Sequence, residues 1–401
     1  MNKFSAPLAL HCWEYGAGLG HVTALSNIAA RLKLLKFKNI LANPDGTNFV
    51  DKGVFDFVLE MPNIAQLSSS HPQSPVHIVS YNSTVKGFGF HEIKFVFTRL
   101  LLWKSFLEKH RPDLVVADYA PAAVFAARSM GIPVVATGNG YTLPPVNIQA
   151  YPRFVNQLDP VPTAPLLNSI NQAAKLTGMQ QIDALPQVFS ADIHACFTMH
   201  ALDPFAKIRQ PQALGPLLGK KPPSVHKRAT NDAGIFVYLT HCSSDLRTNL
   251  IAALASIDHA VSIYSLQTTQ EDRRLAEGTK ITFLSTPVPL SDICRDNKLV
   301  IHLGGHILTM ELLLAGMPQL LLPIDLEKIL LAQGVENKGL AAQLRADHTK
   351  TPTQFANKIQ STLSDETLPD RAMAFAATRK ESEWHDGLDT LAEQMSELMR
   401  I

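Results

Sequence analysis

The feature that most constrains the fold is an alternation of short apolar runs with helical patterns, which occurs twice along the chain. In the first half, strands are predicted at residues 8–13, 39–42, 55–61, 114–117 and 133–137. In the second half, they are predicted at residues 235–239, 260–264, 281–284, 299–302 and 319–322. Strands separated by helical segments indicate a parallel sheet with helices on both faces. The sequence therefore predicts an α/β protein with two Rossmann-like domains facing a cleft.

The domain boundaries follow from where this pattern stops and starts again. Residues 1–218 are predicted to form the N-terminal domain and residues 235–378 the C-terminal domain. Residues 219–234 contain two prolines, four Lys or Arg and few apolar side chains, which is typical of a linker. Residues 379–401 show helical spacing and predict a helix that packs back toward the first domain.

The balance of charges limits the classes of partner. The formal net charge of the 401 residues is +1, which gives no electrostatic reason to expect a nucleic acid. Four scattered cysteines indicate no zinc site and suit a reducing cytoplasm. No secretory signal is seen at the N-terminus, and no run approaches the ~20 apolar residues of a membrane span. The apolar helix predicted at residues 92–110 is interpreted as a core helix, and a peripheral membrane contact stays open.

A glycine-rich loop follows the first predicted strand. Gly16, Gly18 and Gly20 allow a tight turn and the close approach of a ligand, and His21 comes directly after them. This loop lies at the carboxyl end of a strand, where open α/β sheets bind ligands. No acidic residue ends the second strand, which argues against a nicotinamide enzyme. His21 is a candidate general base, and the alternative is that it only caps the helix.

Asp118 ends another strand predicted for the same sheet. Because the carboxyl ends of parallel strands share one edge, Asp118 is a candidate to accept a hydrogen bond from His21 and to fix its tautomer. The alternative is that Asp118 caps the helix predicted to start near Pro121.

The second half offers three loops at strand ends. Gly304 and Gly305 stand between a buried strand and a helix containing Glu311, and amide groups at such a helix start favour an anion such as a diphosphate. The acidic loop with Glu327 and Lys328 is a candidate sugar contact, and Thr240 is a candidate phosphate contact. The alternatives are a plain tight turn at the glycines and solvated loops elsewhere.

Taken together, these segments resemble the B-fold nucleotide-sugar glycosyltransferases, and in particular the bacterial macrolide and UDP-glucuronosyl type. The resemblance rests on the order of five segments along nearly the whole chain: GAGLGH, RPDLVVAD with the following GIPVV, LGPL, IHLGGHILTMELLLAGMPQLLLP, and the acidic loop after it.

The resemblance implies a role for each matching residue. His21 would be the base that deprotonates the acceptor, and Asp118 would support it. Gly304 and Gly305 would hold the donor diphosphate, Glu311 the ribose, and Glu327 with Lys328 the donor sugar. No metal or resident cofactor is implied, and the co-substrate would be a nucleotide-diphosphate sugar, with UDP expected.

The chain departs from the family pattern at the donor loop. Leu303 stands where the family usually has a phosphate-binding histidine, and Lys328 replaces the usual glutamine. Three alternatives follow: His302 or His306 substitutes for the missing histidine, the donor is unusual, or donor binding is weakened. The predicted function is inverting, metal-independent transfer of a sugar to a hydroxyl group of a small-molecule or lipid acceptor. Residues 80–90 and 141–148 are expected to bind this acceptor. The alternatives are a nucleotide-sugar hydrolase or epimerase and a non-catalytic binding protein.

Overall fold

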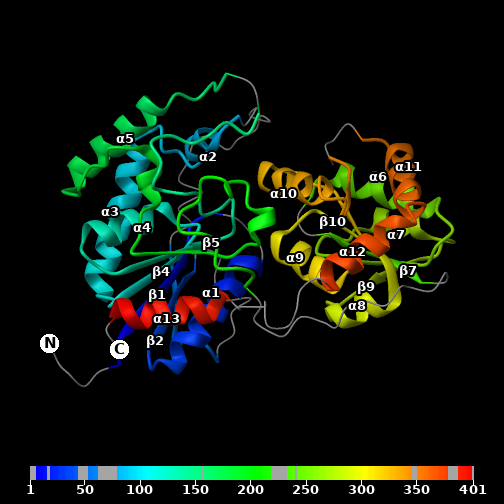
Figure 1. Cartoon of the computed structure of the whole chain (residues 1–401), viewed down its shortest axis with the longest axis horizontal. Helices are drawn as coiled ribbons and strands as arrows, with labels where there is room; N and C mark the ends of the chain where they lie inside the picture. The colour runs from blue at the N-terminus through cyan, green and yellow to red at the C-terminus, as the bar shows by residue number, and fades with distance from the viewer. Residues whose placement is uncertain are drawn as a thin grey trace. The chain divides into compact units, whose positions relative to one another are not determined.

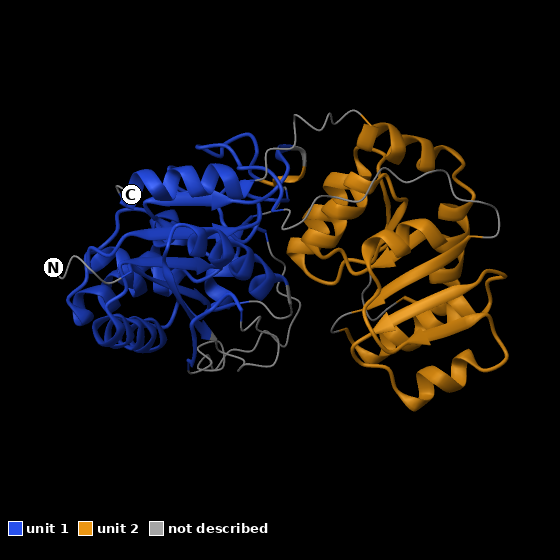
Figure 2. Cartoon of the chain, turned by 90° about the horizontal axis from the view of Figure 1, so that it is seen from below, with its two compact units in different colours: residues 1–200, 205–217, 386–401 blue, residues 201–204, 218–385 orange. Residues whose placement is uncertain are grey.

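The computed structural model describes residues 6–15, 19–43, 53–61, 79–155, 158–217, 233–239, 242–345, 350–377 and 387–399. The chain divides into two compact units (Figure 2). The first comprises Met1–His200, Phe205–Leu217 and Asp386–Ile401, and the second comprises Ala201–Pro204 and Leu218–His385. The predicted linker at residues 219–234 lies almost wholly outside the described residues.

The first unit is built on a parallel sheet in the order β3-β2-β1-β4-β5-β6 (Figure 1). Its strands are β1 (Leu8–Trp13), β2 (Lys38–Asn43), β3 (Phe57–Glu60), β4 (Leu114–Asp118), β5 (Val134–Gly138) and β6 (Ile193–Cys196). The central strands β1 and β4 are apolar and almost completely buried, which is typical of a sheet covered on both faces. All five strands predicted in this half are present.

Helices cover both faces of this sheet. The described helical segments are α1 (Leu19–Leu34), α2 (Tyr81–Gly87), α3 (Ile93–His110), α4 (Pro121–Ser129), α5 (Thr163–Thr177), η2 (Leu185–Phe189), η3 (His200–Leu202) and α13 (Gly387–Met399). Helix α13 returns to the first unit and buries Leu388, Leu391 and Met395 in the same core as Leu25 and Ile28 of α1. Helix α3 packs against both α4 and α5 (Figure 1).

The second unit repeats the design. Its parallel sheet has the order β12-β11-β10-β7-β8-β9. The strands are β7 (Gly234–Leu239), β8 (Val261–Ser265), β9 (Ile281–Leu284), β10 (Asn297–His302), β11 (Gln319–Leu321) and β12 (Ala342–Gln343). When the strands of each unit are counted from its own first strand, both sheets have the order 3-2-1-4-5-6. In such sheets the connections reverse direction between strands 1 and 4, and open α/β sheets bind ligands in the crevice at that switch point.

The helices of the second unit begin and end at recognisable signals. They are α6 (Ser244–Ala255), α7 (Gln270–Ala276), α8 (Leu290–Asp296), α9 (His306–Ala315), α10 (Leu326–Glu336), α11 (Pro352–Leu363) and α12 (Thr367–Ala377). Ser243 caps α6 by accepting a hydrogen bond from the Leu246 amide. Helix α9 ends at Gly316, whose φ of +72° is left-handed and suits glycine.

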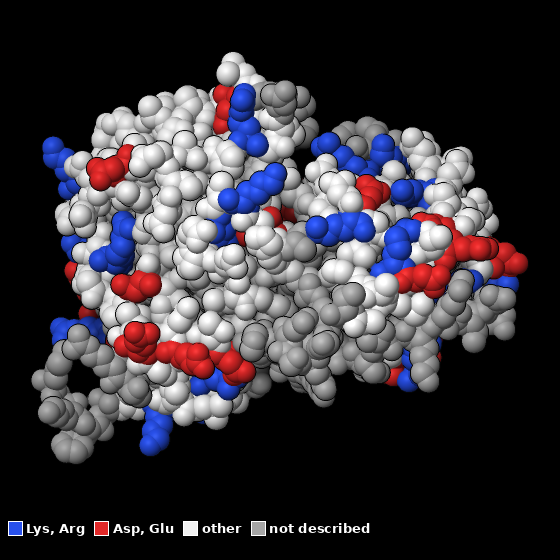
Figure 3. All heavy atoms as spheres, in the orientation of Figure 1, with Lys and Arg blue, Asp and Glu red and all other residues white. Residues whose placement is uncertain are grey.

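Among the described residues, no helix combines the length and the apolar character that crossing a bilayer requires. Figure 3 shows one face of the molecule, on which basic and acidic side chains are both scattered and neither kind covers a broad area. The helix predicted at residues 92–110 is α3, and it buries Val96, Leu100, Trp103 and Leu107 on one side. This pattern supports its interpretation as a core helix.

Candidate functional site

His21 and Asp118 flank the crevice of the first sheet. His21 lies in α1, which follows β1, and Asp118 is the last residue of β4. Strands β1 and β4 are neighbours, and Trp13 of β1 is the register partner of Asp118. The connections therefore bring the two predicted catalytic side chains to the point where open α/β sheets bind ligands.

The two side chains form a hydrogen bond. The Nδ1 atom of His21 lies 2.7 Å from Oδ2 of Asp118, and the side chains are 18% and 5% exposed. Because an ionised carboxylate only accepts hydrogen bonds, Nδ1 of His21 carries the proton. In the neutral ring, Nε2 then has a lone pair that can accept a proton from a ligand.

The capping alternatives do not describe these residues. His21 is the third residue of α1, inside the helix, rather than its cap. The N-cap residue of α4 is Ala120, two positions after Asp118. The Asp118 carboxylate is instead committed to the imidazole of His21.

Aromatic rings surround the imidazole. Tyr119 lies nearly parallel to His21, with ring centroids 6.2 Å apart and an interplanar angle of 14°. Tyr119 also packs edge-on against Phe88, whose ring stacks on Tyr15 at 3.9 Å. These three residues, Tyr15, Phe88 and Tyr119, form an aromatic group beside His21, and each of them is less than 10% exposed.

The two segments expected to bind an acceptor come together in the first unit. Residues 80–90 include α2 and the turn after it, and Tyr141, the first residue of the other segment, contacts α2. The hydroxyl of Tyr141 lies 2.5 Å from Oγ1 of Thr84, and the ring of Tyr141 lies 5.2 Å from that of Tyr81. Phe88 at the end of this segment belongs to the aromatic group. The segments therefore connect directly to the surroundings of His21.

In the second unit, Gly304 and Gly305 form the connection from β10 to α9. Gly304 has a φ of +83°, a left-handed conformation that favours glycine. Gly305 is the N-cap of α9, and His306 is its first residue, two positions earlier than the predicted helix start. The first turn of α9 therefore begins just after β10, which neighbours β7 at the switch point of the second sheet. The free amide groups of such a helix start favour an anion.

The two candidate histidines of this loop differ in their exposure and in their hydrogen bonds. His302 is completely buried, and its Nε2 donates to Oε1 of Gln319 at 2.9 Å while its Nδ1 accepts from the Gly304 amide at 3.2 Å. Burial lowers the pKa of His302 to about 4, so the ring is neutral. His306 is partly exposed at the start of α9, and burial of its ring lowers its pKa to about 4 as well, so this ring is also neutral. Both nitrogens of His302 serve the loop itself, whereas His306 lies at the surface of the loop.

Glu311 lies one and a half turns into α9 and is partly exposed. Burial raises the pKa of its carboxyl group, and the nearby Glu311 charge contributes, after burial, to raising the pKa of Cys294 to about 12. Glu311 therefore lies on the side of α9 that faces α8.

The acidic loop lies close to the glycine turn. Asp325 caps α10 by accepting from the Lys328 amide at 3.0 Å, and its carboxylate also forms an ion pair with the Lys328 ammonium. A Cβ atom placed on Gly304 would meet the Cβ of Lys328 at 3.4 Å. The structure thus brings Lys328 against the glycine turn, while Glu327 is partly exposed on the first turn of α10.

Three predicted site residues, Gly16, Gly18 and Thr240, lie outside the described residues. Gly20 is described and is exposed in the first turn of α1, before His21. The described ranges contain no group of three or more His, Cys, Asp or Glu side chains arranged to hold a metal ion.

Comparison with solved structures gives close matches over nearly the whole chain. The calicheamicin glycosyltransferase CalG4 matches with a TM-score of 0.69 and 15% identity, covering 98% of both chains. The kitacinnamycin glycosyltransferase matches with a TM-score of 0.66 and 16% identity, covering 98% of this chain and 99% of that one. The glycosyltransferase VinC in complex with dTDP matches with a TM-score of 0.64 and 16% identity over 98% of both chains. No protein-family model and no curated protein matches the sequence.

The chain has the glycosyltransferase B fold. This confirms the predicted fold class, with two Rossmann-like units. Within this fold, His21 and Asp118 occupy the crevice of the first unit, and the glycine turn with Lys328 occupies that of the second.

One buried residue of this B-fold chain was missed by sequence reasoning. Glu14 follows β1, is 3% exposed, and accepts hydrogen bonds from the amides of Ala122 and Ala123. Burial raises its pKa to about 7, against the opposing effects of the Arg99 charge and the two amide bonds. The only signal was an acidic residue at the end of an apolar run.

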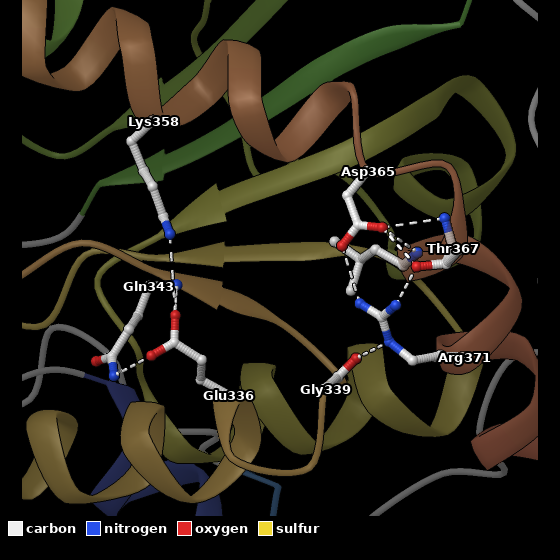
Figure 4. Close-up of polar contacts among 8 residues, drawn as sticks. Glu336, Gly339, Gln343, Lys358, Asp365, Thr367 and Arg371 are labelled. Atoms are coloured by element: carbon white, nitrogen blue, oxygen red, sulfur yellow. Dashed lines mark hydrogen bonds and ion pairs between the residues drawn. The ribbon is translucent and has the colours of Figure 1, made fainter.

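A small polar cavity of the second unit is a poor candidate for a ligand site. It has a volume of about 110 Å³ and includes Lys358, Asp365 and Arg371 in its lining. Figure 4 shows that Arg371 is engaged by Gly339, Thr367 and Asp365. The cavity lies beside Ala342 at the amino end of β12, whereas ligands of such sheets bind at the carboxyl ends.

Proposed function

We propose that the chain is a glycosyltransferase that moves a sugar from a nucleotide-diphosphate donor to a hydroxyl group, with inversion at the anomeric carbon. The observation that carries this proposal is the 2.7 Å hydrogen bond between His21 and Asp118 at the crevice of a B-fold sheet. A histidine held by a carboxylate in this way has the tautomer that a general base needs.

The proposed mechanism is a single displacement. Nε2 of His21 removes the proton of the acceptor hydroxyl, and the oxygen attacks the anomeric carbon as the nucleotide diphosphate leaves. Asp118 stabilises the imidazolium that forms. The leaving diphosphate is stabilised by amides at the start of α9, with Lys328 as a cationic partner, His306 as a neutral hydrogen-bond donor, and no metal ion.

The proposed donor carries a pyrimidine nucleotide, and Glu311 and Glu327 are assigned to its ribose and sugar. UDP was expected from the sequence resemblance, and the VinC structure with dTDP supports testing thymidine nucleotides equally. The acceptor is proposed to be a small molecule or lipid that binds the first unit between α2 and residues 141–148, beside the aromatic group. The four cysteines, all in the described ranges, form no disulfide, which supports a reducing setting such as the cytoplasm.

A transfer assay tests the proposal. The chain is incubated with UDP- and dTDP-sugars and a panel of hydroxyl-bearing acceptors, and products are detected by a mass increase of one sugar. Transfer that His21→Ala abolishes is expected. Consumption of the donor without any acceptor would instead indicate a hydrolase or epimerase.

A non-catalytic binding protein is the second candidate, and the donor loop favours it. Leu303 is 3% exposed where the family usually has a phosphate-binding histidine, and His302 is completely buried. Calorimetric titration with UDP and dTDP separates the candidates when combined with the transfer assay. Tight binding without turnover would favour the binding protein.

A further inference from the structure

Helix α4, which follows Asp118, has no capping side chain of its own in the described structure. Its N-cap residue is Ala120, which makes no side-chain hydrogen bond, and its first residue is Pro121. The first amides of a helix need acceptors from outside the helix. Because proline has no N–H, the first amides of α4 are those of Ala122 and Ala123.

The missing cap comes from the end of β1. Oε1 of Glu14 accepts from the Ala123 amide at 2.7 Å, and Oε2 accepts from the Ala122 amide at 3.2 Å. An anion at this end of a helix is favoured by the helix dipole, and burial strengthens the bonds. A residue more than 100 positions away therefore fixes the first turn of α4.

The turn that this cap holds carries the partner of His21. Only Tyr119 and Ala120 stand between Asp118 and the first residue of α4. Tyr119 has a φ of +49°, a left-handed conformation that a residue other than glycine keeps only when its surroundings enforce it. Movement of the first turn of α4 would consequently move Asp118 and the Tyr119 ring together.

We propose that Glu14 is a positioning residue for the His21–Asp118 pair: by clamping the first turn of α4 it fixes the Asp118 carboxylate against Nδ1 of His21. This role rests on the proposed function, in which that pair removes the acceptor proton. Glu14 acts through α4 and is not assigned a contact with substrate.

Burial raises the pKa of Glu14 to about 7, and a neighbouring cation opposes this shift. Arg99 of α3, which is 1% exposed, is the cation that favours the ionised carboxyl group. The other titratable groups that interact with Glu14 come from the end of β1, where the pKa values of Cys12 and Tyr15 are raised by burial first and by Glu14 in addition. Asp118 of β4 acts on the same Cys12 thiol. Arg99 also lies over the Tyr15 ring, 5.4 Å from its centroid, which joins the clamp to the aromatic group.

The test compares Glu14→Gln, which keeps one carbonyl acceptor, with Glu14→Ala, which removes both acceptors. The readout is the tautomer of His21 in the full chain, measured from its imidazole ¹⁵N resonances at a pH where the ring is neutral. Asp272→Asn is the matched control. Asp272 is also a completely buried carboxylate at a helix start, but it lies in the second unit. It accepts hydrogen bonds from the Thr269 amide and from Nε of Arg247, both at 2.7 Å.

In the wild type and in Asp272→Asn, His21 is expected to carry its proton on Nδ1. Glu14→Ala should shift the ring toward the Nε2–H form, and Glu14→Gln should shift it less. The transfer rate should fall about tenfold in Glu14→Ala and about threefold in Glu14→Gln, because part of a general-base contribution of ~10²–10⁴ to the rate is lost. The KM for the donor should stay nearly constant.

An unchanged tautomer in a folded Glu14→Ala chain would overturn the clamp. Equal changes in the Gln and Ala variants would overturn it as well, because charge alone would then explain them. If the wild type transfers no sugar, the proposed function fails, whereas the tautomer measurement still decides whether Glu14 positions Asp118.

Discussion

Nδ1 of His21 and Oδ2 of Asp118 lie 2.7 Å apart although 97 positions separate the two residues in the chain. Asp118 is buried at the end of β4, and its carboxylate already holds His21 in the absence of a ligand. A base held in advance loses little conformational entropy when the reaction occurs. The pair can therefore be tested by removing one side chain at a time.

His21→Ala removes the proposed base. Sugar transfer should fall about 10²–10⁴-fold, because no other group replaces the lost proton transfer. Donor affinity should be nearly unchanged, since the donor is assigned to the second unit. Turnover with saturating acceptor and calorimetric Kd for UDP or dTDP measure the two effects. Equal turnover in variant and wild type would remove His21 from the mechanism.

Asp118→Asn keeps the size of the side chain but replaces the anionic acceptor. The amide can donate to Nδ1 and so favours the wrong tautomer of His21, and it no longer stabilises the imidazolium. We expect a rate loss of ~10²-fold or more with little change in thermal stability. Loss of folding in place of activity would show that Asp118 is mainly structural.

Glu14→Gln should change how stability depends on pH. The pKa of Glu14 is raised from 4.5 to about 7, so the folded state binds the proton more tightly than the unfolded state. Tighter proton binding by Glu14 therefore adds to the free energy of unfolding. This added stability is complete below pH 4.5 and is lost as the pH rises through 7. The loss amounts to about 3 kcal/mol for a shift of this size. Urea unfolding should therefore show that the free energy of unfolding decreases less between pH 5 and pH 8 in Glu14→Gln than in the wild type. Identical decreases in the two proteins would contradict the prediction.

The two histidines of the donor loop should give different variants. His306→Ala should weaken binding of the nucleotide diphosphate about two- to tenfold, the value of one hydrogen bond donated by a neutral ring. His302→Leu leaves Oε1 of Gln319 and the Gly304 amide without their partner, and it should lower the free energy of unfolding by about 1–3 kcal/mol. Calorimetry and urea unfolding of both variants check this assignment. A larger affinity loss in His302→Leu than in His306→Ala would reverse it.

Lys328→Gln tests which part of the donor the lysine contacts. Lys328 lies against Gly304, so we expect it to interact with the diphosphate rather than with the sugar alone. Affinity for the nucleotide diphosphate and for the nucleotide sugar should then fall by the same factor, about threefold to tenfold. The loss should be smaller at high salt. A loss confined to the nucleotide sugar would place the contact on the sugar.

The repeated strand pattern was sufficient to predict the fold. Leu8–Trp13 and Ile281–Leu284 were predicted with the boundaries that the structure has, because each is an apolar run with clear ends. Helices such as α5 and α11 were not predicted, although Thr351 and Gln354 form a capping box before α11 that signals its start. Their apolar side chains do recur at helical spacing, as Phe355 and Ile359 show in α11 and Leu166 and Ile170 in α5, so both helices could have been predicted.

The candidate site was only partly accessible to sequence reasoning. His21 and Asp118 stood out because each follows a predicted strand of one sheet. Glu14 did not, because its role depends on amides 108 and 109 positions away that only the folded chain brings near. The choice between His302 and His306 also needed the structure, since the hydrogen bonds of His302 to Gln319 and to the Gly304 amide form only in the folded chain.

The return of α13 to the first unit has a consequence for biosynthesis. Leu388, Leu391 and Met395 fill the core beside α1, so this core stays incomplete until residues 387–399 have left the ribosome. The second unit is translated before residues 387–399. It can therefore fold while apolar side chains of α1 such as Leu25 and Ile28 are not yet covered by α13. The first unit is thus the first to be synthesised and the last to finish folding.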